Sequence, residues 1–143
     1  MNWCPPLDLV FACWWELRPA TLPKTLSTCR VRKILALRLF EDNDKRWQKS
    51  VKDLNLELLC ISQFTLYHRL KGNKPDFSAA MKEEEAQKLY NHFLERLVQS
   101  YDSSKIKDGK FGAYMQVHIE NDGPVTINLE SPDEKPAIEG IDK

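Results

Sequence analysis

Few cysteines are present, and their spacing is wrong for a metal site. The chain has four cysteines in 143 residues, at Cys4, Cys13, Cys29 and Cys60. No two of them form a CxxC pair, and they do not reach the density of a disulfide scaffold. We therefore expect reduced thiols, no bound metal and no cofactor.

Conventional catalytic groups are also sparse. The three histidines, His68, His92 and His118, lie far apart in the sequence, and a histidine without a partner network is more often a surface residue than a catalytic base. No paired acids stand out, since Glu83–Glu85 open a predicted helix, where acidic residues favour the helix dipole. The glycine-rich phosphate-binding motifs are missing as well. The sequence therefore shows no signature of a side-chain triad, a metal site or a P-loop, and this absence bears on any catalytic mechanism.

The sequence also lacks an excess of positive or of negative charge. Lys and Arg number 21, as do Asp and Glu, so RNA contacts require a local basic patch. The longest apolar stretch near the start, Leu7–Trp15, is too short to span a bilayer and contains Asp8. No basic leader precedes it. We expect a single-domain cytoplasmic protein that does not enter a membrane.

Hydrophobic periodicity predicts several elements. Apolar residues at helical spacing predict a short helix over about residues 25–37 and a long one over Lys82–Tyr101. The acidic cluster Glu41–Asp44 is typical of a turn. Val51–Asn55 is a weak strand candidate, whereas Leu56–Leu66 contains a continuous apolar run that favours a strand buried on both faces.

The last part of the chain alternates between apolar and polar residues. Met115–Glu120 and Val125–Glu130 each show the alternation of a half-buried strand, and the turn Asn121–Pro124 between them predicts a hairpin. Proline and charge from Pro132 onward predict a disordered tail. At the other end, prolines interrupt Met1–Lys24, which shows no regular pattern.

Four segments, taken in order, resemble the signatures of the D-aminoacyl-tRNA deacylases. Ser62–Tyr67 looks like their SQxTL motif, and Asn121–Thr126 looks like their Gly-cisPro motif, NxGPVT. Lys71–Phe77 and Gly109–Val117 match in order and spacing between them. Each segment alone has an ordinary structural explanation, such as a strand cap or a hairpin turn. Together they favour membership of this family, in its Gly-cisPro branch, from about Val31 to Pro132.

The resemblance implies an α/β (α+β) fold with an antiparallel or mixed sheet, or barrel-like core, flanked by two helices. We divide the chain into an atypical segment 1–30, a deacylase domain 31–132 and a tail 133–143. The first segment does not resemble the family's first strands, so we expect those strands to be missing. Their loss would expose a sheet edge. This leaves an alternative open, a catalytically impaired variant that acts as a dimerisation or nucleic-acid-binding module.

The activity implied by the resemblance is chiral proofreading in translation, the hydrolysis of the ester of D-aminoacyl-tRNA and of mischarged glycyl-tRNA. An ester can be cleaved by positioning and charge stabilisation alone. The main-chain N–H groups of Phe64 and Thr65 would hold the oxyanion, Ser62 would place the carbonyl, and Gln63 belongs to the same site. The 2′-OH of the terminal ribose would assist. A Thr65 nucleophile ranks second, because no base adjoins it in the sequence.

The resemblance also implies a homodimer. A cis peptide at Gly123–Pro124 would reach into the partner subunit's site and exclude L side chains. The pocket for the terminal adenosine and aminoacyl group would be lined by Phe111, Ala113 and Met115. The phosphate contacts expected for the substrate, D-aminoacyl-tRNA, are Lys71, Lys74 and Lys110.

Overall fold

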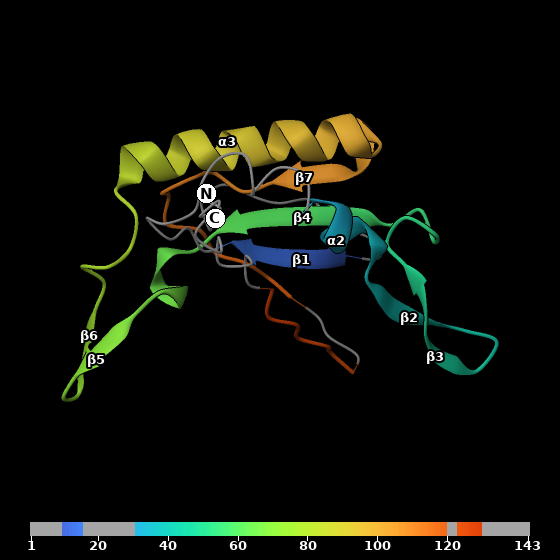
Figure 1. Cartoon of the computed structure of the whole chain (residues 1–143), viewed down its shortest axis with the longest axis horizontal. Coiled ribbons are helices and arrows are strands. Elements are labelled where there is room, and N and C mark those ends of the chain that lie inside the picture. Colours follow the sequence, from blue (N-terminus) through green and yellow to red (C-terminus); the bar gives the residue numbers. More distant parts are fainter. Residues whose placement is uncertain (1–9, 16–30, 120–122, 130–143) are drawn as a thin grey trace, which may run out of the picture.

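A parallel sheet forms the centre of the molecule. The computed structural model describes residues 31–119 and 123–129, together with the main chain of residues 10–15. Strands β1 (Val10–Trp15), β4 (Glu57–Ser62) and β7 (Ile106–Asp108) form a three-stranded sheet in the order β1-β4-β7, and the strands lie side by side in Figure 1. Both neighbours run parallel to β4. As the middle strand, β4 buries four consecutive residues, Leu58–Ile61, as expected for a strand covered on both faces.

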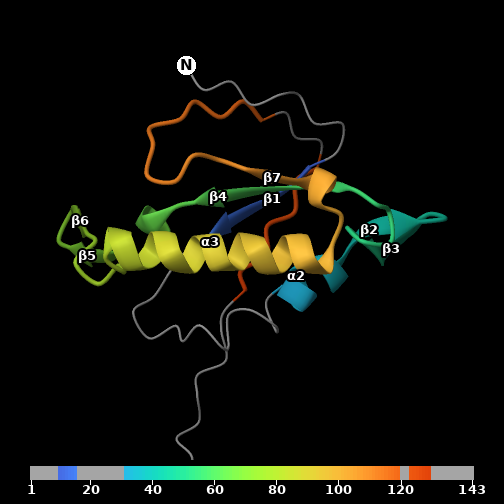
Figure 2. The ribbon, with the colours of Figure 1, turned by 90° about the horizontal axis from the view of Figure 1, so that it is seen from above.

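Helix α3 (Glu83–Ser100) lies along the strands and covers one face of the sheet (Figures 1 and 2). It begins with three glutamates, which complement the positive end of the helix dipole. Its buried side chains recur every three to four residues, as in an amphipathic helix; they are Ala86, Leu89, Tyr90, Phe93 and Leu97. They share one core with α2 (Val31–Ala36) and with Leu58 and Cys60 of β4.

Two antiparallel hairpins project from opposite ends of the sheet (Figure 1). Strands β2 (Arg38–Asp42) and β3 (Lys45–Ser50) form the first, and β5 (Arg69–Lys71) and β6 (Lys74–Asp76) form the second. The turn of the first hairpin places Asn43 and Asp44 at φ of 48° and 60°. Such positive values suit a tight two-residue hairpin turn, and Asn and Asp tolerate them.

Between residues 25 and 101, several expectations are confirmed and one is wrong. The long helix, the turn at Asn43 and Asp44 and the buried strand are present, and α2 forms the later part of the predicted short helix. The buried strand ends at Ser62, because the chain then turns. Val51–Asn55 is not a strand: the Asp53 carboxylate accepts hydrogen bonds from the N–H and hydroxyl of Ser50, at 2.9 and 2.7 Å, and closes a turn instead.

The N-terminal expectation needs correction. Val10–Trp15 is not irregular, because it pairs with β4 in register from Val10 opposite Glu57 to Trp15 opposite Ser62. Valine and aromatic residues favour strands, and the nearby prolines all lie outside this stretch. A mixed α/β fold with two described helices is confirmed. The three-stranded sheet is parallel, however, and the described strands do not close into a barrel.

The predicted hairpin near the C-terminus is also absent from the described residues. Residues 113–119 and 124–129 form no strand there, and Val117, Ile119, Val125 and Ile127 are each between 41% and 51% exposed. A segment with alternating apolar and polar residues forms a strand only where a neighbouring strand accepts and donates its main-chain hydrogen bonds. None of the described residues provides such a neighbouring strand. The tail from Pro132 lies outside the described residues.

Candidate functional site

The candidate site begins where β4 ends. Ser62 is the last residue of β4, and a 3-10 turn, Phe64–Leu66, follows at once. The carboxyl ends of parallel strands meet at one edge of a sheet, where open α/β sheets bind ligands. Here the N–H of Gly109, just after β7, donates to the carbonyl of Cys60 at 2.9 Å. This bond brings the Gly109–Val117 segment beside Ser62.

The 3-10 turn holds Thr65 through hydrogen bonds. The side-chain amide of Gln63 donates to the Thr65 hydroxyl. The Nδ1 atom of His68 lies 3.1 Å from the main-chain oxygen of Thr65, not from its hydroxyl. The turn is closed by the N–H groups of Leu66 and Tyr67. Within the described chain, the N–H groups of Phe64 and Thr65 donate to no main-chain carbonyl, so both remain available to a ligand.

Hairpin β5–β6 is attached to this turn by an aromatic contact. The rings of Phe64 and Phe77 meet edge to face, with centroids 5.2 Å apart. Phe64 is nevertheless 60% exposed. The hairpin's two strands and Phe77 line a shallow hollow; its residues are Lys71, Lys74, Pro75, Asp76 and Phe77. Two of the motifs found in sequence, Ser62–Tyr67 and Lys71–Phe77, are therefore neighbours.

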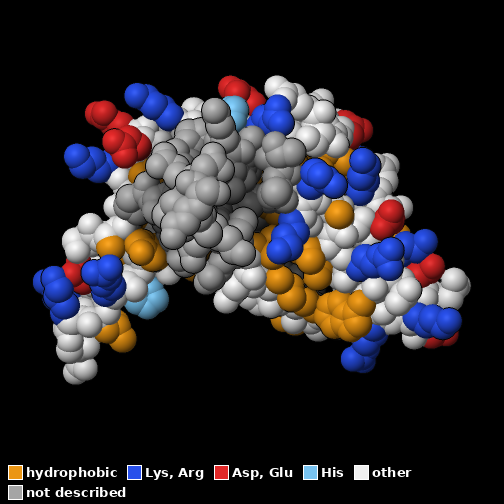
Figure 3. All heavy atoms as spheres, in the orientation of Figure 1, with side chains coloured by type: hydrophobic (Ala, Val, Ile, Leu, Met, Phe, Trp, Pro, Cys, Tyr) orange, Lys and Arg blue, Asp and Glu red, His pale blue; other side chains and the backbone are white. Residues whose placement is uncertain are grey.

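The three lysines predicted to contact phosphates differ in whether an acidic side chain already pairs with them. Lys71 pairs with Asp76, and hydrogen bonds from Lys71 and from Ser78 hold the pKa of Asp76 well below its usual range. Lys74 and Lys110 are exposed and form no ion pair with a described residue. Basic side chains are visible at this end of the molecule in Figure 3. Lys74 and Lys110 are thus the freer cations.

The predicted pocket residues lie in a loop beside the sheet edge. Phe111, Ala113 and Met115 are each partly buried, and a turn forms between them as Ala113 N–H donates to the Lys110 carbonyl at 3.3 Å. Met115 lies against Gly109: a Cβ at Gly109 would come within 3.3 Å of its Sδ and Cε atoms. The absence of a side chain at Gly109 therefore allows Met115 to reach the sheet.

Tyr90 and Asp108 tie this loop to α3, a link that sequence reasoning missed. The Tyr90 hydroxyl donates to Asp108 Oδ1 at 2.6 Å, and the Tyr90 ring lies 5.5 Å from that of Phe111. Partial burial raises the pKa of Asp108, an effect opposed by the hydrogen bonds from Tyr90 and from the N–H of Gly109. The helical stripe indicated that Tyr90 is buried, but nothing in the sequence pointed to its partner.

The structure does not bring Gly123 and Pro124 to the other site residues. Both are exposed, and no described residue comes within 4 Å of a Cβ built at Gly123. The predicted cis bond is wrong for this chain, because no peptide bond of the described residues is cis. The trans form is favoured by about 0.5–1 kcal/mol before proline, and no described neighbour offsets that preference.

Among the described residues, no group of three or more His, Cys, Asp or Glu could hold a metal ion. The described helices include none that is both long and apolar enough to cross a membrane.

Similarity to known proteins extends over most of the chain. The family model described as D-Tyr-tRNA(Tyr) deacylase matches residues 23–130, and this range contains every site residue discussed above. The chain belongs to this family, a family of hydrolases, as the sequence motifs predicted. It is 83% identical over 113 residues to the D-aminoacyl-tRNA deacylase of Drosophila melanogaster, covering 79% of this chain and 72% of that protein. It is 66% identical over 103 residues to D-aminoacyl-tRNA deacylase 1 of Homo sapiens, covering 71% of this chain.

Solved structures show the same fold. The c-Myc DNA Unwinding Element Binding Protein superimposes with a TM-score of 0.78 at 57% identity, over 85% of this chain and 81% of that one. A probable eukaryotic D-amino acid tRNA deacylase superimposes with a TM-score of 0.66 over 79% of this chain and 80% of that one, and at 13% identity it supports the fold alone. The chain spans about half the length of its mouse and human relatives, 49% in each case.

Proposed function

We propose that this chain hydrolyses the ester bond of D-aminoacyl-tRNA, and of mischarged glycyl-tRNA, as chiral proofreading in the cytoplasm. The observation that carries the proposal is the turn at the carboxyl end of β4. Ser62 lies there, followed by two main-chain N–H groups, of Phe64 and Thr65, that no described carbonyl accepts. Such preorganised donors stabilise the oxyanion of an ester's tetrahedral intermediate.

In this mechanism the peptide backbone does the work of a catalytic side chain. The N–H groups of Phe64 and Thr65 hold the developing oxyanion, while the Ser62 hydroxyl orients the carbonyl. The 2′-OH of the terminal ribose assists the attack of a water molecule on the carbonyl carbon. The bond between this carbon and the ribose oxygen then breaks, the ribose oxygen takes up a proton from the water, and the amino acid leaves as the free acid, so the RNA takes part in its own deacylation. Phe111, Ala113 and Met115 receive the terminal adenosine and the aminoacyl group, and they lie in the loop that Gly109 attaches to the same sheet edge.

The hydrogen bonds of Thr65 argue against a nucleophilic hydroxyl. An attacking hydroxyl needs a base to take its proton. The hydroxyl of Thr65 accepts a hydrogen bond from the Gln63 amide, and an amide is not a base. His68, the nearby imidazole, contacts the main-chain oxygen instead. These contacts support a positioning role for Gln63 and for the Thr65 side chain.

A homodimer would complete the site. The exposed apolar residues near the C-terminus are of the kind that pairs with another chain; they are Tyr114, Val117, Ile119, Val125 and Ile127. Association through them would place the exposed Gly123–Pro124 turn at a partner's site, where its main chain would exclude L side chains. Lys74 and Lys110, with Lys71 as a weaker contributor, would bind tRNA phosphates.

The experiment compares purified chain on D-Tyr-tRNA and L-Tyr-tRNA. We expect catalytic release of D-tyrosine and no acceleration for the L substrate over the uncatalysed rate. Hydrolysis of D-Tyr-tRNA and L-Tyr-tRNA at equal rates would contradict the proposal that the site excludes L side chains. No hydrolysis of either, by protein shown to be folded by circular dichroism, would leave the impaired variant as the better description.

A second candidate function is DNA binding. It is favoured by one observation, the 57% identity and TM-score of 0.78 to a protein named for binding a DNA unwinding element. A binding titration with the labelled DNA element tests it. Binding that persists in a Ser62→Ala variant without deacylase activity would show that the two functions are separate.

A further inference from the structure

Trp47 of strand β3 has an unusual backbone conformation. Its φ is 63°, in the left-handed region, where a bulky residue is rare and strained. The register of β2 and β3 shifts on both sides of Phe40, and such bulges turn side chains away from the regular pleat. Despite its size, Trp47 remains 49% exposed. The hairpin thus accepts backbone strain while presenting an indole to solvent.

The strand that carries Trp47 is basic. β3 contains Lys45, Arg46 and Lys49 and no acidic residue. Lys49 is paired with Asp42 across the hairpin at 3.3 Å. Lys45 and Arg46, with Arg38 at the start of β2, are exposed and form no ion pair with a described residue. Three cations without an ion partner among the described residues therefore share one small hairpin with an exposed aromatic ring; the acidic side chains of Glu41 and Asp44, also exposed, lie at or near its turn.

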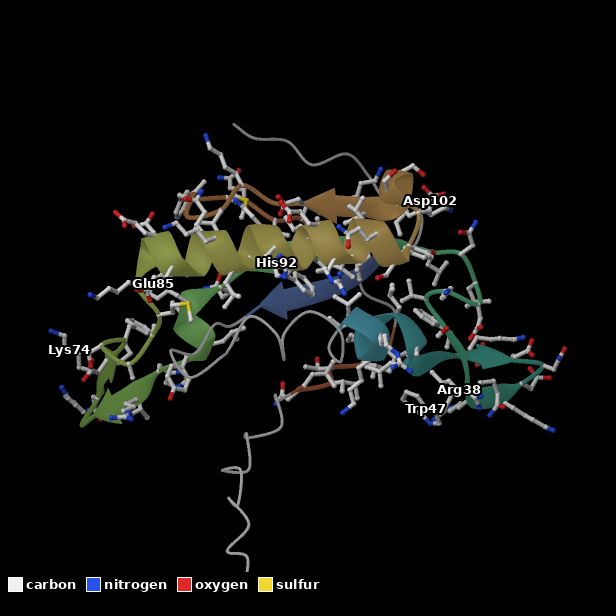
Figure 4. The ribbon with its side chains drawn as sticks, turned by 45° about the horizontal axis from the view of Figure 1, so that its top comes forward. Arg38, Trp47, Lys74, Glu85, His92 and Asp102 are labelled. Atoms are coloured by element: carbon white, nitrogen blue, oxygen red, sulfur yellow. The ribbon has the colours of Figure 1, made fainter. Side chains whose placement is uncertain are left out.

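This surface is distinct from the candidate deacylase site. The β2–β3 and β5–β6 hairpins lie at opposite ends of the sheet in Figures 1 and 2. Figure 4 likewise places Trp47 and Arg38 at one end of the molecule and Lys74 at the other. The candidate site at the end of β4 therefore gives no reason for the exposure of the Trp47 indole at the other end of the molecule.

We propose that the β2–β3 hairpin binds an unpaired polynucleotide strand. One base stacks on the Trp47 indole, and the neighbouring phosphates contact Arg38, Lys45 and Arg46. Basic side chains interleaved with an exposed aromatic ring are the usual means of holding single-stranded nucleic acid, because every base offers a face for stacking. Paired bases do not offer that face, so a duplex should bind only weakly through its phosphates. RNA and DNA share this chemistry, and the test separates them.

The test titrates labelled oligonucleotides of about 12 nucleotides, a length within the usual range for one single-strand site. Single-stranded RNA, single-stranded DNA of the same sequence and an RNA duplex are compared by fluorescence anisotropy. The key variant is Trp47→Asn, because Asn adopts positive φ more readily than Trp. We expect this variant to unfold at the same temperature as the wild type or higher, and to bind the preferred single strand at least about tenfold more weakly.

A matched pair of variants tests the cations. Arg46→Ala and Lys88→Ala each remove one exposed positive charge, the first from the hairpin and the second from α3. We expect Arg46→Ala to weaken binding and to reduce the salt dependence by about one released counterion, and Lys88→Ala to leave both nearly unchanged. No oligonucleotide carries an aminoacyl ester, so the outcome does not depend on whether the chain is a deacylase.

Three results would overturn the proposal. Trp47→Asn could bind as tightly as the wild type, or the duplex could bind as tightly as the single strand. The third is that Trp47→Asn lowers the oligomeric mass measured by light scattering, which would assign the indole to an interface between copies of this chain.

Discussion

Single side chains hold the loop of residues 109–115 against α3, and the clearest example is the hydroxyl of Tyr90, a residue of that helix. Tyr90→Phe keeps the ring that contacts Phe111 but removes the 2.6 Å hydrogen bond to Asp108. A hydrogen bond to a charged group contributes about 1.5–3 kcal/mol, and partial exposure of Asp108 favours the lower end. We expect a loss of this size in the free energy of unfolding at pH 7, measured by urea denaturation, and a higher KM with kcat less affected.

Tyr101→Phe is the matched control for this change. Tyr101 donates to the carbonyl of Leu56 at 2.8 Å, at the other end of α3 from its first turn. The Tyr101→Phe variant likewise loses one partly buried hydrogen bond of a tyrosine hydroxyl. Tyr101, however, does not adjoin the 109–115 loop. Equal effects of the two variants on KM would show that Tyr90 has only a general structural role.

Asp108 contributes one component of the pH dependence of stability, opposite in sign to that of Asp53, Asp76 and Asp102, whose pKa values are lowered by hydrogen bonds. Burial raises the pKa of the Asp108 carboxyl group, so the folded state holds this proton more tightly than the unfolded state. Stability from this group is therefore greatest below the ordinary Asp pKa and falls as the pH rises through the folded value. We expect the stability of Asp108→Asn relative to the wild type, measured by thermal unfolding between about pH 3 and pH 7, to increase as the pH rises. An unchanged pH profile in the variant would contradict the assignment.

Gly109 provides a further residue-level prediction. A methyl group there would come within 3.3 Å of the tip of Met115. That tip is flexible, so Gly109→Ala should cost less than about 1 kcal/mol of stability. Met115 would move, however, and we expect KM for D-Tyr-tRNA to rise severalfold. A variant with unchanged KM would show that Met115 does not line the substrate pocket.

Among the elements, those fixed by local periodicity were predictable. The apolar stripe predicted α3, and the continuous apolar run predicted β4, because both patterns are satisfied by the same core. The parallel pairing of β1 was not predictable, since no local pattern specifies which distant strand a segment joins. The hairpin predicted over Met115–Glu130 does not form among the described residues of the single chain, for a related reason. Alternation of apolar and polar residues indicates that one face of a segment is buried, but it does not identify the segment that covers this face.

The β5–β6 hairpin and the turn after β4 should behave as a unit. Their link is the contact between Phe64 and Phe77, and such aromatic pairs contribute about 0.5–1.5 kcal/mol beyond their burial. We expect Phe77→Ala to increase amide hydrogen exchange at residues 63–67 and to lower kcat. Faster exchange without a change in kcat would separate the hairpin from catalysis.

For the whole molecule, the candidate site could be predicted only in part. In the structure, Phe64 contacts Phe77 of the Lys71–Phe77 segment, and Gly109 is hydrogen-bonded to Cys60 near the end of β4; the motifs named these segments but gave no indication of their distances in space. Gly123 and Pro124 remain apart from them in one chain. Their predicted role depends on a second subunit, and the geometry of an assembly is not encoded in the local pattern of a single sequence.

The dimer can be tested by introducing charge into its proposed interface. Val117 and Val98 are 41% and 43% exposed, respectively, and Val98 lies on α3. We expect Val117→Glu to yield monomers in analytical ultracentrifugation and to abolish deacylation, because a buried unpaired carboxylate strongly opposes association. Val98→Glu should change neither. Monomeric wild-type protein that deacylates D-Tyr-tRNA would refute the proposed shared site.

In the proposed mechanism, main-chain amides after β4, rather than the Thr65 hydroxyl, stabilise the reacting ester. The most direct measurement is the single-turnover rate of D-Tyr-tRNA hydrolysis by wild-type protein and by Thr65→Ala. The substitution keeps the N–H group, so the account predicts that the rate falls by no more than about tenfold. A fall of roughly a thousandfold or more, as expected when a nucleophile is removed, would contradict it.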